Sequence, residues 1–342
     1  MTPTAVSEER GQFLAHRRYV RSFAVMCGHI HGHPYNRVWQ DLTDLVGLAP
    51  PLEASGAPNL VVVRKRLASA WGTEYLLALN HRYAREDDIV RLTNIWAVVQ
   101  TYYVHYHAIH ALLAALGRDQ PSTHAKTQAA FASTWAGRAH HVPPCSFGWG
   151  FDGAMNAPSG IRVDTSVHPW SNADEQTCYS LAAKALRTTR DEALRIRKGS
   201  RRVQKQRTLR REWERDEEER LAAGKRPRKP RSFPLPTLGR IEHKEIDRRM
   251  RVFSLMDYLY RLRVKSNYLD STMFTEGPEQ EDESLGLLQD LKDLAGNVLL
   301  VHELNVREAV SQDVFLKMID EWIAPRGGPQ LGVAERRSIL AG

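Results

Sequence analysis

The sequence has few cysteines and no long apolar run, and both absences narrow the class of protein. Its 342 residues include three cysteines, which lie far apart in the chain. This usage argues against a disulfide framework or a cysteine-based zinc site, and is typical of a reducing compartment. No run of about 18 apolar residues is present, and the first residues lack the apolar core of a secretory signal. We therefore expect a cytoplasmic protein that makes no contact with membranes.

Several common sequence motifs are also missing. The chain contains no phosphate-binding loop of the G-x-x-x-x-G-K-[ST] type, no G-x-S-x-G nucleophile motif and no dinucleotide-binding glycine pattern. These motifs carry nucleotide hydrolysis, acyl transfer and hydride transfer in the enzymes that use them. We therefore expect no cofactor.

Helical patterns account for most of the chain, so we predict an all-α fold. From Ile89 to Leu113, apolar and aromatic residues recur at steps of three and four, which is the helical period. The segment 60–84 opens with β-branched residues, so we expect it to begin as a strand before it becomes helical. Residues 137–172 are rich in Gly, Pro and Ser and should be irregular. Further helices are predicted at 7–27, 34–47, 123–135, 174–224, 243–268, 283–308 and 311–323.

The positive charge is concentrated in one segment, which we call the basic arm. The chain carries a net charge of +8, and residues 184–231 hold 19 Lys and Arg against 8 Asp and Glu. The arm therefore has an excess of 11 positive charges, and the rest of the chain carries a net −3. Complete internal pairing is ruled out, so a nucleic-acid partner is favoured over a solvated helix whose arginines pair with acids. The residues expected to contact phosphate are Arg195, Arg197, Lys198, Arg201, Arg202, Lys205, Arg207, Arg210 and Arg211.

Two short motifs, far apart in the chain, resemble those of one protein family. The first joins a helix rich in Tyr and His to a helix that opens with Thr-His, through Tyr102, Tyr103, His107, Ala108, Ala111, Leu112, Leu113, Gly117, Thr123 and His124. The second is YRLRVKSNYLD, with Leu262, Arg263, Asn267, Tyr268 and Asp270. Together they resemble HEPN domains, which are helical bundles found in ribonucleases, toxins and defence proteins. The matches cover roughly 85–135 and 245–310.

The resemblance implies a HEPN-like helical bundle with a long basic helical insertion and an N-terminal helical extension. It also implies a homodimer, because HEPN sites commonly form across a symmetric pair. The corresponding divisions are an N-terminal helical region (1–84), the first half of the bundle (85–135), an irregular region (136–172), the basic arm with its Pro-rich linker (173–239), the second half of the bundle (240–325) and a flexible tail (326–342).

The resemblance also suggests catalytic residues. Active HEPN ribonucleases use an Arg followed four to six residues later by a His. The Arg can hold a phosphate with two hydrogen bonds, and the His can move a proton near neutral pH. Three pairs have this spacing, namely Arg118–His124, Arg10–His16 and Arg162–His168, and chance matches are expected in a chain so rich in both residues. The second candidate is a composite site in which Arg263 acts with His107 or His124.

Two functions therefore stay open. The first is a metal-independent endoribonuclease with a toxin or antiphage role. The second is a catalytically inactive RNA- or DNA-binding subunit of a larger defence or guide-RNA complex, with RNA favoured over DNA in both cases. In the second case Arg118 and His124 belong to a capped turn, and His107 packs in a helical seam. Arg263 then joins a structural polar network with Tyr103, Asn267 and Tyr268.

One histidine cluster invites a metal interpretation. His29, His31 and His33 occupy alternate positions, so in an extended chain their side chains share one face, like a grip for zinc or another transition metal. No Asp or Glu lies within the motif, and its glycines suggest a turn in which the histidines cap a helix end. We therefore expect no metal centre.

Overall fold

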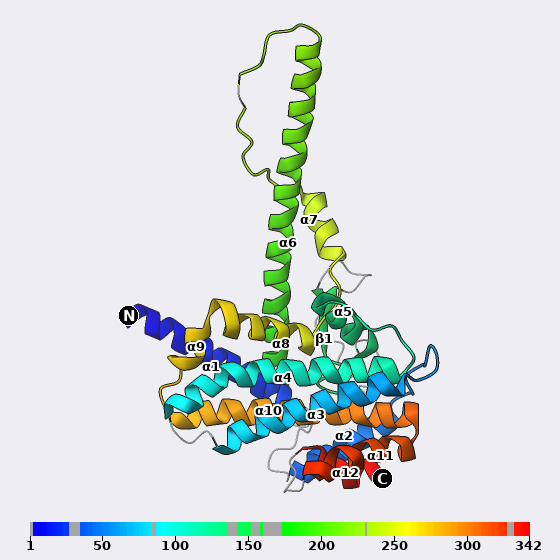
Figure 1. The fold of residues 1–342 in the computed structure, drawn as a ribbon. Coiled ribbons are helices and arrows are strands. Elements are labelled where there is room, and N and C mark those ends of the chain that lie inside the picture. The colour runs from blue at the N-terminus through cyan, green and yellow to red at the C-terminus, as the bar shows by residue number, and fades with distance from the viewer. Residues whose placement is uncertain are drawn as a thin grey trace.

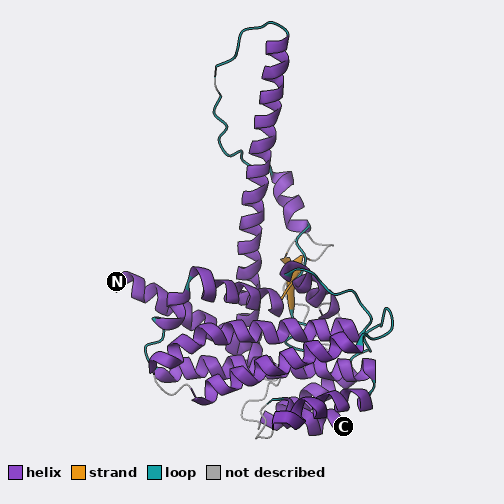
Figure 2. Ribbon diagram, viewed as in Figure 1, coloured by secondary structure: helices purple, strands orange, loops and turns teal. Residues whose placement is uncertain are grey.

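A body of packed helices and one long protruding helix make up the structure (Figure 1). The computed structural model describes residues 3–26, 35–83, 87–135, 142–151, 158–159, 173–229, 231–326 and 332–342. Helices hold 79% of these residues, which confirms the all-α class (Figure 2). Among the described helices, none is long and apolar enough to span a membrane.

The centre of the body is formed by α3 (Leu60–Tyr83), α4 (Asp87–Ala115) and α10 (Glu281–Val310). The first two form an antiparallel hairpin, and α10 packs against both of them. The middle of α10 is buried on all sides, as expected for a helix that is apolar round its circumference. The surrounding helices are α1 (Pro3–Met26), α2 (Tyr35–Leu48), α5 (His124–Trp135), α9 (Ser271–Thr275), α11 (Gln312–Ile323) and α12 (Val333–Ala341), with a 3₁₀ turn, η2 (Ala324–Arg326), after α11.

The predicted strand at the start of the segment 60–84 is wrong, because α3 is helical from Leu60 onward. The side chain of Asn59 accepts a hydrogen bond from the backbone N–H of Val62 at 3.1 Å, which is a helix-starting cap. Val63 and Leu67 then lie one turn apart and are fully buried in the body. This packing outweighs the weak preference of valine for strands.

The protruding helix is α6 (Ala173–Ala222), and it confirms the helix predicted at 174–224. Its 50 residues span about 75 Å. The buried side chains Tyr179, Ala182 and Leu186 anchor its lower end in the body, where it packs on α1 and α8. Gly224, with φ of +72°, reverses the chain, and residues 225–229 and 231–239 return beside α6 to α7 (Arg240–Arg248). We call the projecting part of α6, its return segment and α7 the stalk.

The single helix predicted at 243–268 is interrupted. After α7 comes a two-residue strand, β3 (Phe253–Ser254), and then α8 (Leu255–Val264) and a π-helical turn, η1 (Lys265–Leu269). The carboxylate of Asp257 explains the break, because it accepts a hydrogen bond from the extended Ser254 N–H at 2.8 Å and pairs with Arg251. The strand β3 joins β1 (Gly148–Phe151) and β2 (Pro158–Ser159) in an antiparallel sheet of order β2-β1-β3.

A buried ion-pair cluster fastens α12 to the body. The guanidinium of Arg336 is fully buried, and its Nε lies 2.7 Å from Glu303 Oε2 while its Nη2 lies 3.0 Å from Glu74 Oε2. Trp71 donates its indole N–H to Glu303 Oε1 at 2.7 Å. Two carboxylates therefore surround one guanidinium, and the cluster joins α3, α10 and α12.

Candidate functional site

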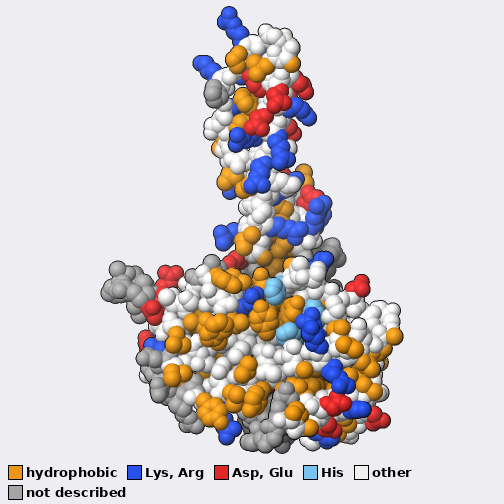
Figure 3. All heavy atoms as spheres, viewed as in Figure 1, with side chains coloured by type: hydrophobic (Ala, Val, Ile, Leu, Met, Phe, Trp, Pro, Cys, Tyr) orange, Lys and Arg blue, Asp and Glu red, His pale blue; other side chains and the backbone are white. Residues whose placement is uncertain are grey.

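A group of aromatic rings surrounds one arginine where α4, α5 and α8 meet. Figure 3 shows histidine side chains among hydrophobic ones on this face of the body, just below the stalk. We call the group the Arg263 cluster. It consists of Tyr102 and Tyr103 from α4, His124 from α5, and Tyr260 and Arg263 from α8.

Arg263 holds a positive charge over aromatic faces. Its guanidinium carbon lies 5.3 Å from the ring centroids of both Tyr102 and Tyr103, and 5.8 Å from that of Tyr260. Such contacts stabilise a cation by about 0.5–2 kcal/mol, but they leave its charge in place. Within the described part of the chain no carboxylate pairs with Arg263, and its buried Nε has no hydrogen-bond partner. The site therefore offers an unneutralised guanidinium to an anion.

His124 lies beside this arginine in a form suited to accept a proton. Its Nδ1 is 2.7 Å from the Tyr102 hydroxyl, and its ring centroid is 5.5 Å from that of Tyr260. Partial burial, and then the charge of Arg263, lower the pKa of His124. Burial also raises the pKa of Tyr102, so that hydroxyl stays protonated. A neutral imidazole results, and its Nε2 is left for a ligand when Nδ1 donates to Tyr102.

A second arginine borders the cluster. Arg66, on α3, has its guanidinium carbon 5.9 Å from the Tyr106 ring centroid and its Nη1 3.4 Å from His107 Nδ1. Burial, followed by the charge of Arg66, lowers the pKa of His107 to about 4. The rings of His107 and Tyr103 are stacked at 6.2 Å. Two arginines thus flank one shelf of tyrosine and histidine rings.

Two other polar residues of this region are held by internal bonds. Both ring nitrogens of His110 are occupied, with Nδ1 2.8 Å from Gln120 Oε1 and Nε2 3.1 Å from Thr127 Oγ1. Arg118 donates from Nη2 to the Glu53 carbonyl at 2.7 Å, on the loop before α3. The structure therefore places Arg263, and not Arg118, among the rings round His124, while a catalytic role for Arg118 stays a prediction.

The remaining predicted residues differ in exposure. Asn267 is half-buried on η1, next to Tyr268, which is 73% exposed. Arg10 pairs with Glu279 and Glu283. Its sequence partner in the spacing pattern is His16, whose Nδ1 lies 3.1 Å from the Tyr258 hydroxyl; burial lowers the pKa of this histidine to about 3. Arg10 and His16 therefore each have their own structural partners.

The site also contains residues that the candidate pairs omit. Tyr106 and Tyr260 lie three residues from Tyr103 and Arg263, so helical spacing alone could have added them. Arg66 is 41 residues before His107 in the chain, and no local pattern connects the two. Only the packing of α3 on α4 brings this arginine to the shelf.

The basic arm is neutralised on one side. Residues 193–211 contain no Asp or Glu. From α7, Asp247 reaches Lys198 at 3.1 Å and Glu242 reaches Lys205 at 3.0 Å. Several other cations of the arm bond to neutral groups or to a carboxylate on α6 itself: Arg197 to Met250 Sδ, Arg201 to Gln204, Arg202 to the Pro236 carbonyl and Arg210 to Glu214.

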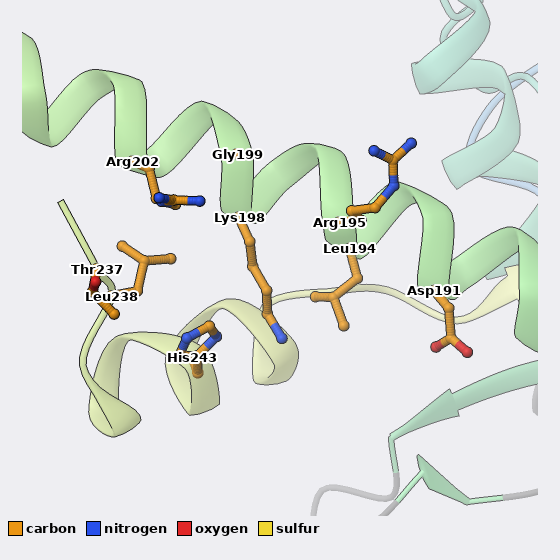
Figure 4. A pocket seen from close by; sticks show the side chains of 9 residues that line it. All are labelled: Asp191, Leu194, Arg195, Lys198, Gly199, Arg202, Thr237, Leu238 and His243. Carbon is orange, nitrogen blue, oxygen red and sulfur yellow. The ribbon is translucent and has the colours of Figure 1, made fainter. Parts of the chain in front are cut away.

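Three arginines of the arm, Arg195, Arg207 and Arg211, are exposed and have no carboxylate partner among the described residues. At the base of the stalk, a pocket of about 680 Å³ lies between α6 and α7. Figure 4 shows Lys198 directed toward α7 and His243, whereas Arg195 points away from α7. The positive charge that no described carboxylate neutralises therefore lies on the exposed surface of the stalk, whereas Lys198 in the pocket pairs with Asp247.

The metal interpretation of His29, His31 and His33 lies outside the described residues, as does the Arg162–His168 pair. Among the residues that the structure does describe, no three His, Cys, Asp or Glu side chains are grouped as metal ligands. No family model, curated protein or solved structure matches the chain.

Proposed function

We propose that the Arg263 cluster binds a phosphate of RNA and cleaves the chain there without a metal ion. One observation carries the proposal: a guanidinium that no described carboxylate neutralises lies beside a histidine with a lowered pKa. A bound anion would act as the counterion of Arg263, with charge-assisted hydrogen bonds to the guanidinium. The ligand would then lie next to the ring that accepts a proton.

The chemistry needs one base and the 2′-hydroxyl of the substrate. His124 takes the proton of the 2′-OH through Nε2, and the 2′-oxygen attacks the adjacent phosphorus. The P–O2′ bond forms and the P–O5′ bond breaks, while the departing 5′-oxygen takes a proton from water. The products are a 2′,3′-cyclic phosphate and a 5′-hydroxyl. Arg263 stabilises the added negative charge on the phosphate oxygens during the attack.

The stalk would supply affinity for the same ligand. Each phosphate that it neutralises releases counterions, so binding weakens steeply as salt increases. The exposed Arg195, Arg207 and Arg211 are suited to this role because no described carboxylate pairs with them. The need for a 2′-hydroxyl favours RNA over DNA at the cleavage site.

A second candidate function is binding without cleavage, as a subunit of a larger nucleoprotein complex. The observation that favours it is the state of the other histidines. Both nitrogens of His110 are bonded, and His107 faces Arg66. His110 has no ring nitrogen free to protonate the departing oxygen, and the lowered pKa of His107 keeps that ring from carrying a proton to donate near neutral pH.

The biological setting is part of the proposal. The resemblance to HEPN domains supports a toxin or antiphage role and a homodimer. Its two motifs contribute the residues that meet in the cluster, namely Tyr102, Tyr103 and His124 from the first and Arg263 from the second.

The test is cleavage of a 5′-labelled single-stranded RNA in EDTA, with separate His124→Ala, Arg263→Ala and Arg118→Ala variants. We expect the first two to abolish cleavage and the third to retain it. A matched control is Arg64→Ala, since Arg64 is an exposed arginine of α3 that pairs with Glu321. A 2′-deoxynucleotide at the cut position should block the reaction.

Three results would count against this assignment. Loss of cleavage in Arg118→Ala alone would move the site to the pair predicted from spacing. Loss of RNA cleavage in EDTA would indicate a metal-dependent enzyme. Salt-sensitive binding with no cleavage would establish the second function.

A further inference from the structure

A strip of exposed apolar side chains leads along α4 to the Arg263 cluster. Ile89, Leu92 and Trp96 are 47%, 59% and 61% exposed. Tyr103 and Tyr106 follow at steps of seven and three, and both are half-buried. Residues at these spacings share one face of a helix. We call these five residues the α4 strip.

The two acidic residues of α4, Asp87 and Asp88, precede the strip in the sequence, and no other acidic residue lies on this helix. From Ile89 to Arg118 the sequence contains no Asp or Glu, and α5 contains none either. On the adjoining α3, Glu74 is buried against Arg336. The cations nearest the aromatic end are Arg66 and Arg263, and neither pairs with a carboxylate among the described residues. The surface therefore joins flat apolar rings to positive charge.

We propose that the α4 strip binds the bases of a single-stranded nucleic acid, one phosphate of which lies at Arg263. The inference rests on the proposed function only in placing that phosphate. Base stacking on aromatic rings needs no particular sequence, and positive charge beside the rings holds the backbone. The strip would extend the binding site from the Arg263 cluster along α4 toward Ile89.

The length of the strip sets the size of the ligand. Trp96 and Tyr103 are separated by about 10 Å along the helix axis, and Ile89 and Tyr106 by about 25 Å. Stacked nucleotides advance by about 3.4 Å each. A strand of roughly seven or eight nucleotides would cover the strip, whereas a dinucleotide would reach only the cluster.

A second copy of the chain is the less favourable occupant. In a two-fold dimer the same patch meets itself. When the two-fold axis passes through the aromatic end of the strip, Arg66 and Arg263 of one copy face the same arginines of the other, and from Ile89 onward α4 has no acidic residue to separate them. Like charges brought together in this way oppose association. A polyanion meets no such cost.

The inference is tested by measuring the affinity for two 2′-O-methyl RNA ligands, a dinucleotide and an octanucleotide. The 2′-O-methyl group prevents their cleavage. Trp96→Leu keeps the apolar surface but removes the ring, so we expect octanucleotide affinity to fall about five- to a hundredfold. Dinucleotide affinity should stay within about twofold. Trp96→Phe should retain octanucleotide binding. The matched control is Leu76→Ala, because Leu76 is a 52% exposed apolar residue on α3.

Equal octanucleotide affinity for Trp96→Leu and the unmodified chain would overturn the inference. So would a dimer, seen by sedimentation, that Trp96→Glu converts to a monomer, because the strip would then join two copies. Octanucleotide binding that needs Trp96, in a protein that cleaves no RNA, would support the strip and contradict the proposed cleavage. No binding of either ligand to the unmodified chain would overturn both.

Discussion

Arg336 is on α12 and Arg263 is on α8, two helices that lie on opposite sides of the body (Figure 1), and both guanidinium groups lie over aromatic rings. The guanidinium carbon of Arg336 is 5.7 Å from the Trp39 ring, and that of Arg263 is 5.3 Å from two tyrosine rings. The difference lies in their counterions. Arg336 has two carboxylates, whereas no described carboxylate pairs with Arg263.

The comparison shows how carboxylate partners distinguish two arginines of the same body. A buried charge without a partner is costly, so Arg336 is enclosed by Glu74 and Glu303 and fastens α12. Arg263 stays half-buried, at the edge of solvent, where the cost is smaller and an external anion can reach it. The presence or absence of carboxylate partners therefore distinguishes a structural arginine from one whose charge an external anion could neutralise.

The largest expected effect is on the stability of the region around Arg336. Arg336→Ala leaves two buried carboxylates without their cation, so we expect the free energy of unfolding to fall by about 3–5 kcal/mol. Its neighbour Arg337, which pairs with Asp320 at the surface, is the matched control, and Arg337→Ala should change the free energy of unfolding far less. Urea denaturation measures both. Equal midpoints for the two variants would contradict the fastening role of Arg336.

The second prediction concerns Arg263. Arg263→Met keeps the contact with the rings but removes a charge that no described carboxylate neutralises, so the melting temperature should stay the same or rise slightly. RNA cleavage should fall at least about a hundredfold, as expected when a phosphate-binding group is removed. Calorimetry and the cleavage rate are measured on the same sample. A loss of stability as large as that of Arg336→Ala would remove the distinction between the two arginines.

A third prediction uses the reverse case, a buried carboxylate without a hydrogen-bond partner on one oxygen among the described residues. Burial raises the pKa of Asp290 to about 7, although Arg17 and Arg21 oppose the shift. The folded protein then holds a proton that the unfolded chain releases above about pH 4, so the free energy of unfolding falls as pH rises from about 4 to 7. At about 1.4 kcal/mol per pH unit across that interval, the loss should be on the order of 4 kcal/mol.

Asp290→Asn should flatten this pH dependence and raise the melting temperature at pH 8 relative to the unmodified chain. Thermal unfolding at pH 5 and pH 8 provides the measurement. The exposed Asp313→Asn variant on α11 is the control and should leave the slope unchanged. A slope that persists in Asp290→Asn would show that other groups cause it.

The smallest effect is expected on the stalk, where the arginines are exposed. Replacing Arg207 and Arg211 with Gln should reduce the salt dependence of RNA binding by about 0.7 for each phosphate that the variant no longer neutralises. Arg210→Gln should change it less, because Arg210 already pairs with Glu214 at 2.7 Å. Fluorescence anisotropy at several salt concentrations distinguishes them. If the unmodified chain, the Arg207 and Arg211 double variant and Arg210→Gln all showed the same salt dependence of binding, the stalk would have no part in binding nucleic acid.

Much of the helical architecture can be predicted from the sequence, because apolar spacing and helix-ending glycines are local signals. The ends of α4 and α6 agree with the predicted helices to within a few residues. The break between α7 and α8 could not be predicted in this way. It depends on Asp257, which joins the extended Ser254 and the side chain of Arg251. Such a tertiary contact has no periodic signature.

The site is predictable only in part, for a similar reason. The motifs contain His124 and Arg263, but their proximity depends on how α5 and α8 pack on α4. Arg66 arrives from a separate helix. The exposure of Trp96 is also hidden, because an apolar residue at helical spacing is usually interpreted as core. The sequence thus indicates candidate residues better than it indicates which of them meet.

The path by which the stalk rejoins the body has a mechanical consequence. Six residues separate the end of α7 from the start of α8, the helix that carries Arg263, and the Arg261–Glu192 ion pair ties α8 to the root of α6 at 2.5 Å. A displacement of the stalk is therefore transmitted to α8 both through the root of α6 and through the short segment that follows α7. The stalk is therefore mechanically connected to the helix whose arginine is proposed to bind a phosphate.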